Sequence, residues 1–145
     1  MSSDLRKKLE GKLAIHSATI PYSPKGGYGD KDQEMGRSMD IRASDDASAK
    51  QTHPIIRIHP ETGREGIFGT FGYIIGIEGM DNQEAIKLLI ELSAWQSQEQ
   101  FQYHHKWKKD MLVMWDNRSV LHRATGGYQG FDRLLHRTTI AAYGS

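Results

Sequence analysis

Apolar residues at helical spacing predict one clear helix in this chain. After Asp81 they recur at i, i+3, i+4 and i+7, which places them on a single face of a helix. Asp81 and Glu84, three residues apart, resemble a capping box at the amino end of that helix. The pattern predicts a helix from Asp81 to about Ser97, whose apolar face consists of Ala85, Leu88, Leu89 and Leu92.

The first fifty residues give weaker patterns. Leu5 and Leu9 are four residues apart and Asp4 is a candidate N-cap, so residues 4–13 predict a short helix. Residues 21–52 are rich in Gly, Ser, Asp and Lys and have almost no apolar periodicity. This composition predicts a long loop that is mobile or partly disordered.

Apolar and β-branched runs predict strands over much of the remaining chain. HPIIRIHP at 53–60 is bounded by prolines, ETGRE follows as a turn, and MLVMW at 111–115 is a continuous apolar run, which is typical of a strand buried on both faces. Many strands with one good helix predict a mainly β fold, a sandwich or jelly roll with a helix packed outside. The other predicted strands are 67–68, Phe101–Trp107, Val120–Ala124 and Leu134–Ala142, and residues 70–80 are expected to be strand or loop rather than helix.

Composition narrows the class of protein. A chain of 145 residues is long enough for one domain with a real core. The net charge of +1 predicts neither a nucleic-acid nor a membrane-surface partner. The absence of cysteine excludes disulfides, zinc–thiolate sites and a cysteine nucleophile. The start, MSSDLRKKLEG, has no apolar core of a signal peptide, so the expected location is the cytoplasm.

His122 is the first candidate for chemistry. In a strand it would point to the same side as Val120 and Ala124, away from Leu121 and Arg123. A histidine between small apolar neighbours is either a packed, partly buried residue or a metal ligand. The residues alone leave both interpretations open.

Arg133 and Arg137 are four residues apart, so a strand places them on one face with Leu135 and Thr139. Two guanidinium groups on an apolar strand are costly to bury unless they meet anions, and the planar guanidinium binds a carboxylate through two hydrogen bonds. The loop TGGYQGF is short enough for a hairpin that brings His122 close to Arg133. The alternative is that both arginines are exposed or pair with Asp132 and Asp116.

Four motifs in this order carry a resemblance to a known family: HPETGR at 59–64, WDNR at 115–118, HRATGGY at 122–128 and DRLLHRTTI at 132–140. The chain resembles the carboxyl-terminal half of the TauD/TfdA family from about Leu5 to Ala142. These are iron(II)- and 2-oxoglutarate-dependent dioxygenases. The resemblance implies a mainly β fold with one or two helices, a partial double-stranded β-helix (jelly roll, clavaminate synthase-like).

The resemblance also implies roles for single residues. His122 matches the distal histidine of the family's 2-His-1-carboxylate iron site. Arg133 matches the arginine that binds the distal carboxylate of 2-oxoglutarate, and Arg137 the arginine that approaches an anionic substrate. The implied cofactors are Fe(II), 2-oxoglutarate as cosubstrate, and O2. WDNR matches a motif for which we expect turn formation and support of the metal histidine rather than catalysis.

One part of the family pattern is absent. The other two iron ligands form a His-x-Asp motif, and none of the histidines here has an aspartate two residues on. His59-Pro60-Glu61 has ligand-like spacing but matches the HPETGR turn. We therefore expect residues 1–145 to be the carboxyl-terminal portion of a dioxygenase domain, in a homo-oligomer or with a complementary amino-terminal half. The histidines are at positions 16, 53, 59, 104, 105, 122 and 136.

The sequence thus gives three hypotheses. The first is part of an oxidoreductase that hydroxylates a small, anionic organic substrate and decarboxylates 2-oxoglutarate to succinate. The second is a catalytically inactive β-domain that acts as an anion-binding or interaction module. The third is a nonfunctional remnant.

Overall fold

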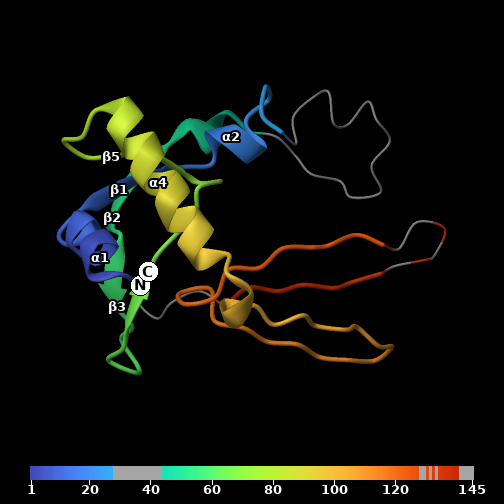
Figure 1. Cartoon of the computed structure of the whole chain (residues 1–145). Coiled ribbons are helices and arrows are strands. Elements are labelled where there is room, and N and C mark those ends of the chain that lie inside the picture. The colour runs from blue at the N-terminus through green and yellow to red at the C-terminus, as the bar shows by residue number, and fades with distance from the viewer. Residues whose placement is uncertain (28–43, 128–129, 131, 133, 141–145) are drawn as a thin grey trace.

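The computed structural model describes residues 1–27, 44–127, 130, 132 and 134–140. The described residues up to 101, here called the folded body, contain two small sheets, and helices α1 and α4 lie on one face of the larger one (Figure 1). Residues 102–140 follow as the carboxyl-terminal segment. The elements are α1 (Ser3–Leu9), β1 (Leu13–Ser17), α2 (Thr19–Tyr22), the 3-10 helix η1 (Asp45–Ser48), β2 (Lys50–Pro54), β3 (Ile56–Ile58), β4 (Glu65–Ile67), β5 (Ile74–Ile77), α4 (Asn82–Gln96) and the 3-10 helix η2 (Glu99–Phe101).

Two antiparallel sheets form from short strands. The first has the order β2-β1-β5, with Ala14 of β1 opposite His53 of β2 and Ile77 of β5. The pairing register between β1 and β5 shifts between Ile15 and His16 of β1. The second sheet is the β3–β4 hairpin, in which Ile56 lies opposite Ile67. The central β1 thus pairs with two strands that both come later in the sequence, β2 and β5.

Helix α4 confirms the strongest prediction from the sequence. Its N-cap is Asp81, whose side chain accepts a hydrogen bond of 2.8 Å from the backbone N–H of Gln83. All four residues of the predicted apolar face are buried. They share the main core with Leu5, Leu9, Ala14, Ile55, Ile74 and Ile77.

Helix α1 is shorter than the predicted 4–13. Leu5 and Leu9 are buried as expected, but Gly11 has φ +67°, a left-handed conformation that favours glycine and ends a helix. Leu13 then begins β1, a strand that the sequence pattern did not predict. The prediction was wrong there because Lys12 and Leu13 continue a helical pattern only if Gly11 is ignored.

The prediction of a single loop over 21–52 is wrong for its described end, where η1 and β2 form; residues 28–43 lie outside the described part. Ser44 caps η1 by accepting a hydrogen bond from the N–H of Asp46. The strand predicted at 53–60 is divided: β2 ends at Pro54, Ile55 is fully buried, and β3 starts at Ile56. Pairing with β1 made an exposed polar stretch into a strand, which local composition does not reveal.

The strands predicted at Phe101–Trp107, Met111–Trp115, Val120–Ala124 and Leu134–Ala142 are absent from the described part of the carboxyl-terminal segment. The chain runs out from the folded body and back in long extended stretches (Figure 1). Leu112 is 85% exposed and Met114 is 82% exposed, so the predicted burial of MLVMW on both faces is wrong. Apolar, extended residues become strands only where a neighbouring strand supplies hydrogen bonds.

Candidate functional site

His122 lies just after a tight turn in the carboxyl-terminal segment. The carbonyl oxygen of Asp116 accepts hydrogen bonds from the N–H groups of Ser119 at 3.1 Å and Val120 at 3.0 Å, which reverses the chain. The side chain of His122 is exposed, and its ring centroid lies 5.0 Å from that of Trp115 across the turn. The indole N–H of Trp115 donates to the amide oxygen of Asn117 at 2.8 Å. Turn formation by WDNR, expected from the sequence, is therefore confirmed.

Of the two candidate arginines, the structure describes only Arg137. Arg133 lies outside the described residues, so its approach to His122 stays a prediction. Arg137 is described and exposed. The alternative partner proposed for these arginines, Asp116, is engaged by Arg118 instead, through four hydrogen bonds of 2.7 to 3.1 Å.

The described residues do not complete an iron site. A 2-His-1-carboxylate site needs two imidazoles and one carboxylate on the same face of the metal. Among the residues that the structure describes, no group of three His, Cys, Asp or Glu side chains is placed to hold a metal ion. The metal role of His122 therefore stays a prediction, and no reaction step can be assigned to the described residues alone.

His59 is not placed as a ligand either, because both ring nitrogens are used by the protein. The ring Nδ1 lies 3.2 Å from the backbone nitrogen of Glu61 and 3.3 Å from that of Thr62. The ring Nε2 lies 2.9 Å from Oδ2 of Asp116. The interpretation of HPETGR as a turn is confirmed by the hydrogen bonds between His59 and Arg64 and between His59 and Gly63.

His59, Glu61, Asp116 and Arg118 form one network, called here the HPETGR–WDNR cluster. Its outer part is an ion pair of 3.6 Å between Nη1 of Arg118 and Oε1 of Glu61. The side chain of His59 is only 13% exposed, which makes it the inner member of the cluster. Sequence reasoning assigned these two motifs to separate turns and missed their contact. The signal in the sequence was that the two motifs carry complementary charged and polar side chains, His59 and Glu61 in one and Asp116 and Arg118 in the other.

The hydrogen bonds from Arg118, and secondarily the one from His59, hold the pKa of Asp116 well below its usual range. A carboxyl whose pKa is depressed by folding contributes stability above its unfolded pKa, and this contribution is lost as the pH falls towards the folded pKa. The Asp116 carboxyl is therefore expected to stay ionised, and paired with Arg118, across the neutral and mildly acidic range.

A second histidine site lies inside the folded body, between the sheet and the chain leaving β4. The His16 ring is 5.1 Å from the His53 ring and 5.6 Å from the Phe68 ring. Gly69 has φ +96°, and a Cβ there would stand 2.4 Å from Cε1 of His16, so only glycine fits beside this ring. Nε2 of His16 is buried and has no hydrogen-bond partner within the described part of the chain.

Burial, and then the charges of His53 and Arg57, lower the pKa of His16 from the ordinary 6.5. In acid the unfolded chain takes up a proton at this position before the folded chain does. We expect the free energy of unfolding to fall as the pH is lowered through the unfolded pKa of 6.5 towards the lower pKa of the folded state. Urea titrations of the wild type and of His16→Gln measure this dependence, and the slope should be smaller in the variant. An equal slope in both would contradict the expectation, and the exposed His104→Gln is the control.

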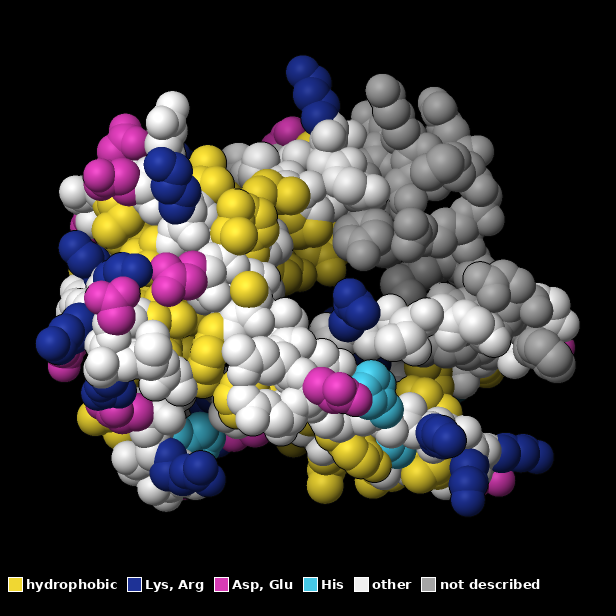
Figure 2. All heavy atoms as spheres, in the orientation of Figure 1, with side chains coloured by type: hydrophobic (Ala, Val, Ile, Leu, Met, Phe, Trp, Pro, Cys, Tyr) yellow, Lys and Arg dark blue, Asp and Glu magenta, His cyan; other side chains and the backbone are white. Residues whose placement is uncertain are grey.

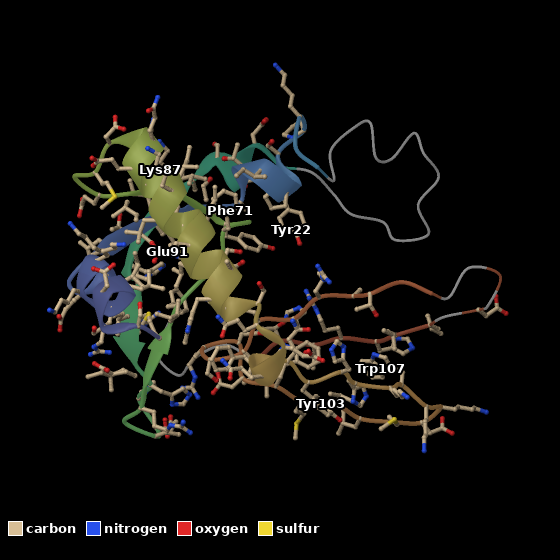
Figure 3. The ribbon with its side chains drawn as sticks, in the orientation of Figure 1. Tyr22, Phe71, Lys87, Glu91, Tyr103 and Trp107 are labelled. Atoms are coloured by element: carbon tan, nitrogen blue, oxygen red, sulfur yellow. The ribbon has the colours of Figure 1, made fainter. Side chains whose placement is uncertain are left out.

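The carboxyl-terminal segment exposes much of its apolar surface. Tyr103 and Trp107 lie along it, well away from the labelled residues of α4 (Figure 3), and hydrophobic side chains gather along its outer side (Figure 2). Exposed apolar side chains gathered in this way often mark a surface that contacts another polypeptide. The most exposed apolar residues of the segment are Tyr103, Leu112, Met114, Leu134 and Ile140, all at 82% or more.

The sequence matches one family model, described as "Taurine catabolism dioxygenase TauD, TfdA family", over residues 1–139. A Schizosaccharomyces pombe protein, provisionally named an alpha-ketoglutarate-dependent sulfonate dioxygenase, is 32% identical over 99% of this chain and 34% of its own length. The alpha-ketoglutarate-dependent 2,4-dichlorophenoxyacetate dioxygenase of Cupriavidus pinatubonensis is 35% identical over 94% of this chain and 44% of its own length. The chain thus spans less than half the length of these curated relatives.

A solved structure gives the same picture. A Burkholderia xenovorans protein, provisionally assigned as an alpha-ketoglutarate dependent 2,4-D dioxygenase, superposes with a TM-score of 0.62 and 29% identity. The superposition covers 82% of this chain and 42% of that protein. The folded body ends at residue 101 of 145, which is less than 82% of the chain. The structural likeness therefore extends into the carboxyl-terminal segment.

Proposed function

Because the chain belongs to the taurine catabolism dioxygenase TauD, TfdA family, we propose that it is part of an iron(II)- and 2-oxoglutarate-dependent dioxygenase. The observation that carries the proposal is the family match over residues 1–139, which includes His122, Arg133 and Arg137. The expected fold class, a mainly β part of a jelly roll, is confirmed by the structural likeness. Family members use Fe(II), 2-oxoglutarate and O2, as the sequence predicts.

In this proposal each predicted residue keeps one role. His122 is one iron ligand through a neutral ring nitrogen. Arg133 binds the distal carboxylate of 2-oxoglutarate, and Arg137 meets the acidic group of the substrate. Bound iron would supply the oxidising chemistry, in which 2-oxoglutarate is decarboxylated to succinate and the substrate is hydroxylated. The exposed position of Arg137 leaves it accessible to a small anion.

The remaining iron ligands are proposed to come from polypeptide outside these 145 residues. Two observations support this. The described residues provide no three-ligand cluster, and the chain spans only 34% and 44% of two relatives that match nearly all of it. The exposed apolar residues of the carboxyl-terminal segment are a surface that a complementary amino-terminal half of the barrel could cover. A homo-oligomer is the alternative arrangement.

A small organic anion is the proposed substrate class. The two relatives are named for a sulfonate and for 2,4-dichlorophenoxyacetate, both of which are organic anions. An arginine at position 137 is the residue type that such groups require.

We place the protein in the cytoplasm; within the described residues, no helix is long and apolar enough to cross a bilayer.

The proposal is tested by reconstitution. The 145-residue chain is combined with the amino-terminal half of a relative that carries His-x-Asp, and succinate is measured with iron(II), 2-oxoglutarate and a panel of sulfonates and aryloxyacetates. Iron-dependent succinate above the level of either part alone is the expected result. Background succinate from a mixture that forms a stable complex would overturn the proposed activity.

An inactive anion-binding module is the second candidate, and the lack of a three-ligand cluster among the described residues favours it. Titration calorimetry of the chain with 2-oxoglutarate distinguishes the two. Binding that requires no iron and is lost in Arg133→Ala supports the module, whereas iron-dependent binding supports the enzyme. An isolated chain that proves largely unfolded would instead favour the nonfunctional remnant.

A further inference from the structure

The HPETGR–WDNR cluster is the polar connection between two parts of the chain that are far apart in sequence. His59 and Asp116 are 57 residues apart. For the described residues, every hydrogen bond or ion pair that joins positions 103–140 to the folded body belongs to this cluster, through His59–Asp116 and Glu61–Arg118. Apart from the adjoining Gln102, which donates hydrogen bonds to Ser97 and Glu99, the described part of the segment is held to the folded body by polar contacts only here.

The geometry of His59 defines its protonation. Two backbone N–H groups, those of Glu61 and Thr62, point at Nδ1, so Nδ1 has to offer a lone pair. Nε2 then carries the proton and donates it to the carboxylate of Asp116 at 2.9 Å. The hydrogen bonds thus favour one tautomer of the ring, which is oriented by its own turn and aimed at Asp116.

Asp116 links this ring to the turn before His122. Its Oδ2 atom accepts hydrogen bonds both from Nε2 of His59 at 2.9 Å and from Nη2 of Arg118 at 2.7 Å. Its backbone carbonyl accepts the N–H groups of Ser119 and Val120, which makes the turn. Position 116 therefore cannot shift without moving the point from which the chain proceeds to His122.

We propose that His59, Asp116 and Arg118 are positioning residues: they dock the WDNR turn on the β3–β4 hairpin and so set the place and orientation of the His122 ring. That His122 is an iron ligand rests on the proposed function, but the docking does not. A ligand ring whose supporting contacts are removed loses metal affinity by about 10- to 100-fold. The present contacts act one step further away, through the backbone that carries the ring.

The first experiment needs no variant and no metal. Two-dimensional NMR of the 15N-histidine-labelled 145-residue chain at neutral pH reports the tautomer of each imidazole. His59 is expected with its proton on Nε2 and a lone pair on Nδ1, and the signal of the exposed His104 serves as the reference. A Nδ1–H form, or a free mixture, at His59 would overturn the proposal.

The second experiment tests positioning. In His59→Ala, hydrogen exchange of the Ser119 and Val120 amides is expected to rise about tenfold, which corresponds to the loss of one hydrogen bond to a charged group, and the ring contact between Trp115 and His122 should weaken. His59→Gln keeps an N–H donor at the place of Nε2 and should restore both. Exchange in α4 serves as the control for folding, and His104→Ala is the matched control variant.

The outcomes separate this proposal from the proposed function. If exchange at Ser119 and Val120 stays at the wild-type level in His59→Ala, the cluster does not position the turn. If α4 also loses protection in both His59 variants, the role is general stability, and positioning is rejected. The tautomer, the exchange rates and the rescue could all be as expected while the reconstituted protein forms no succinate. In that case the positioning role of the HPETGR–WDNR cluster is supported and the enzyme proposal is rejected.

Discussion

Replacing His122 with alanine is expected to lower iron-dependent decarboxylation of 2-oxoglutarate in the reconstituted protein by about 100-fold or more. Loss of even a supporting contact of a metal ligand costs about 10- to 100-fold, and loss of the ligand itself costs at least as much. Two donors hold iron(II) weakly because ligand number and geometry set the affinity of such a site. Succinate formation and iron affinity are measured on the same preparation.

The chain offers matched controls for this change. His136 and His104 are exposed histidines of the same carboxyl-terminal segment, and the resemblance gives neither a role. His136→Ala and His104→Ala should retain activity within about twofold, since exposed substitutions seldom change stability by more than about 0.5 kcal/mol. Activity of His122→Ala equal to that of these controls would remove His122 from the iron site.

Replacing Leu92 with alanine is expected to lower the free energy of unfolding by about 2–5 kcal/mol. Leu92 is 1% exposed and lies on the face of α4 that packs against the sheet and α1. Truncation removes apolar contacts and leaves a cavity that the short strands beneath cannot fully close. Domains of this size have about 5–15 kcal/mol in total, so the variant should be partly unfolded at a moderate temperature.

Ile90 is the control on the same helix. It is 55% exposed and two residues away from Leu92, so Ile90→Ala keeps the helix while removing no core contact. Alanine also has the higher helix propensity, and the expected change is within about 0.5 kcal/mol. Urea unfolding followed by far-ultraviolet circular dichroism gives both values. Equal midpoints for the two variants would show that α4 does not pack as described.

The accuracy of the sequence predictions follows the range of the interactions involved. Asp81 and the apolar face of α4 lie within one helix, and local hydrogen bonding and periodicity identified them correctly. The turn at 59–64 and the turn in WDNR are also local and were predicted. Strand β1 and strand β2, by contrast, depend on each other as partners, and the polar sequence of β2 carries no mark of it.

The strands predicted for the carboxyl-terminal segment but absent from its described residues show the same dependence on a partner strand. Residues 111–115 have the composition of a buried strand, yet they remain extended and exposed, because a strand requires hydrogen-bonding neighbours that the described residues do not supply. Composition predicts the capacity to form a strand. Only the presence of the neighbouring strand decides whether one forms.

By itself the sequence determined the family, the helix α4 and the identity of the three residues proposed for the site, His122, Arg133 and Arg137. These depend on residue type and spacing along one chain. Only the tertiary structure decided that His59 meets Asp116 across 57 positions and that Gly69 is enclosed by His16. Contacts of this kind arise when folding brings segments together that are far apart in the sequence. A local pattern of hydrophobic and polar residues does not show which distant segments will meet.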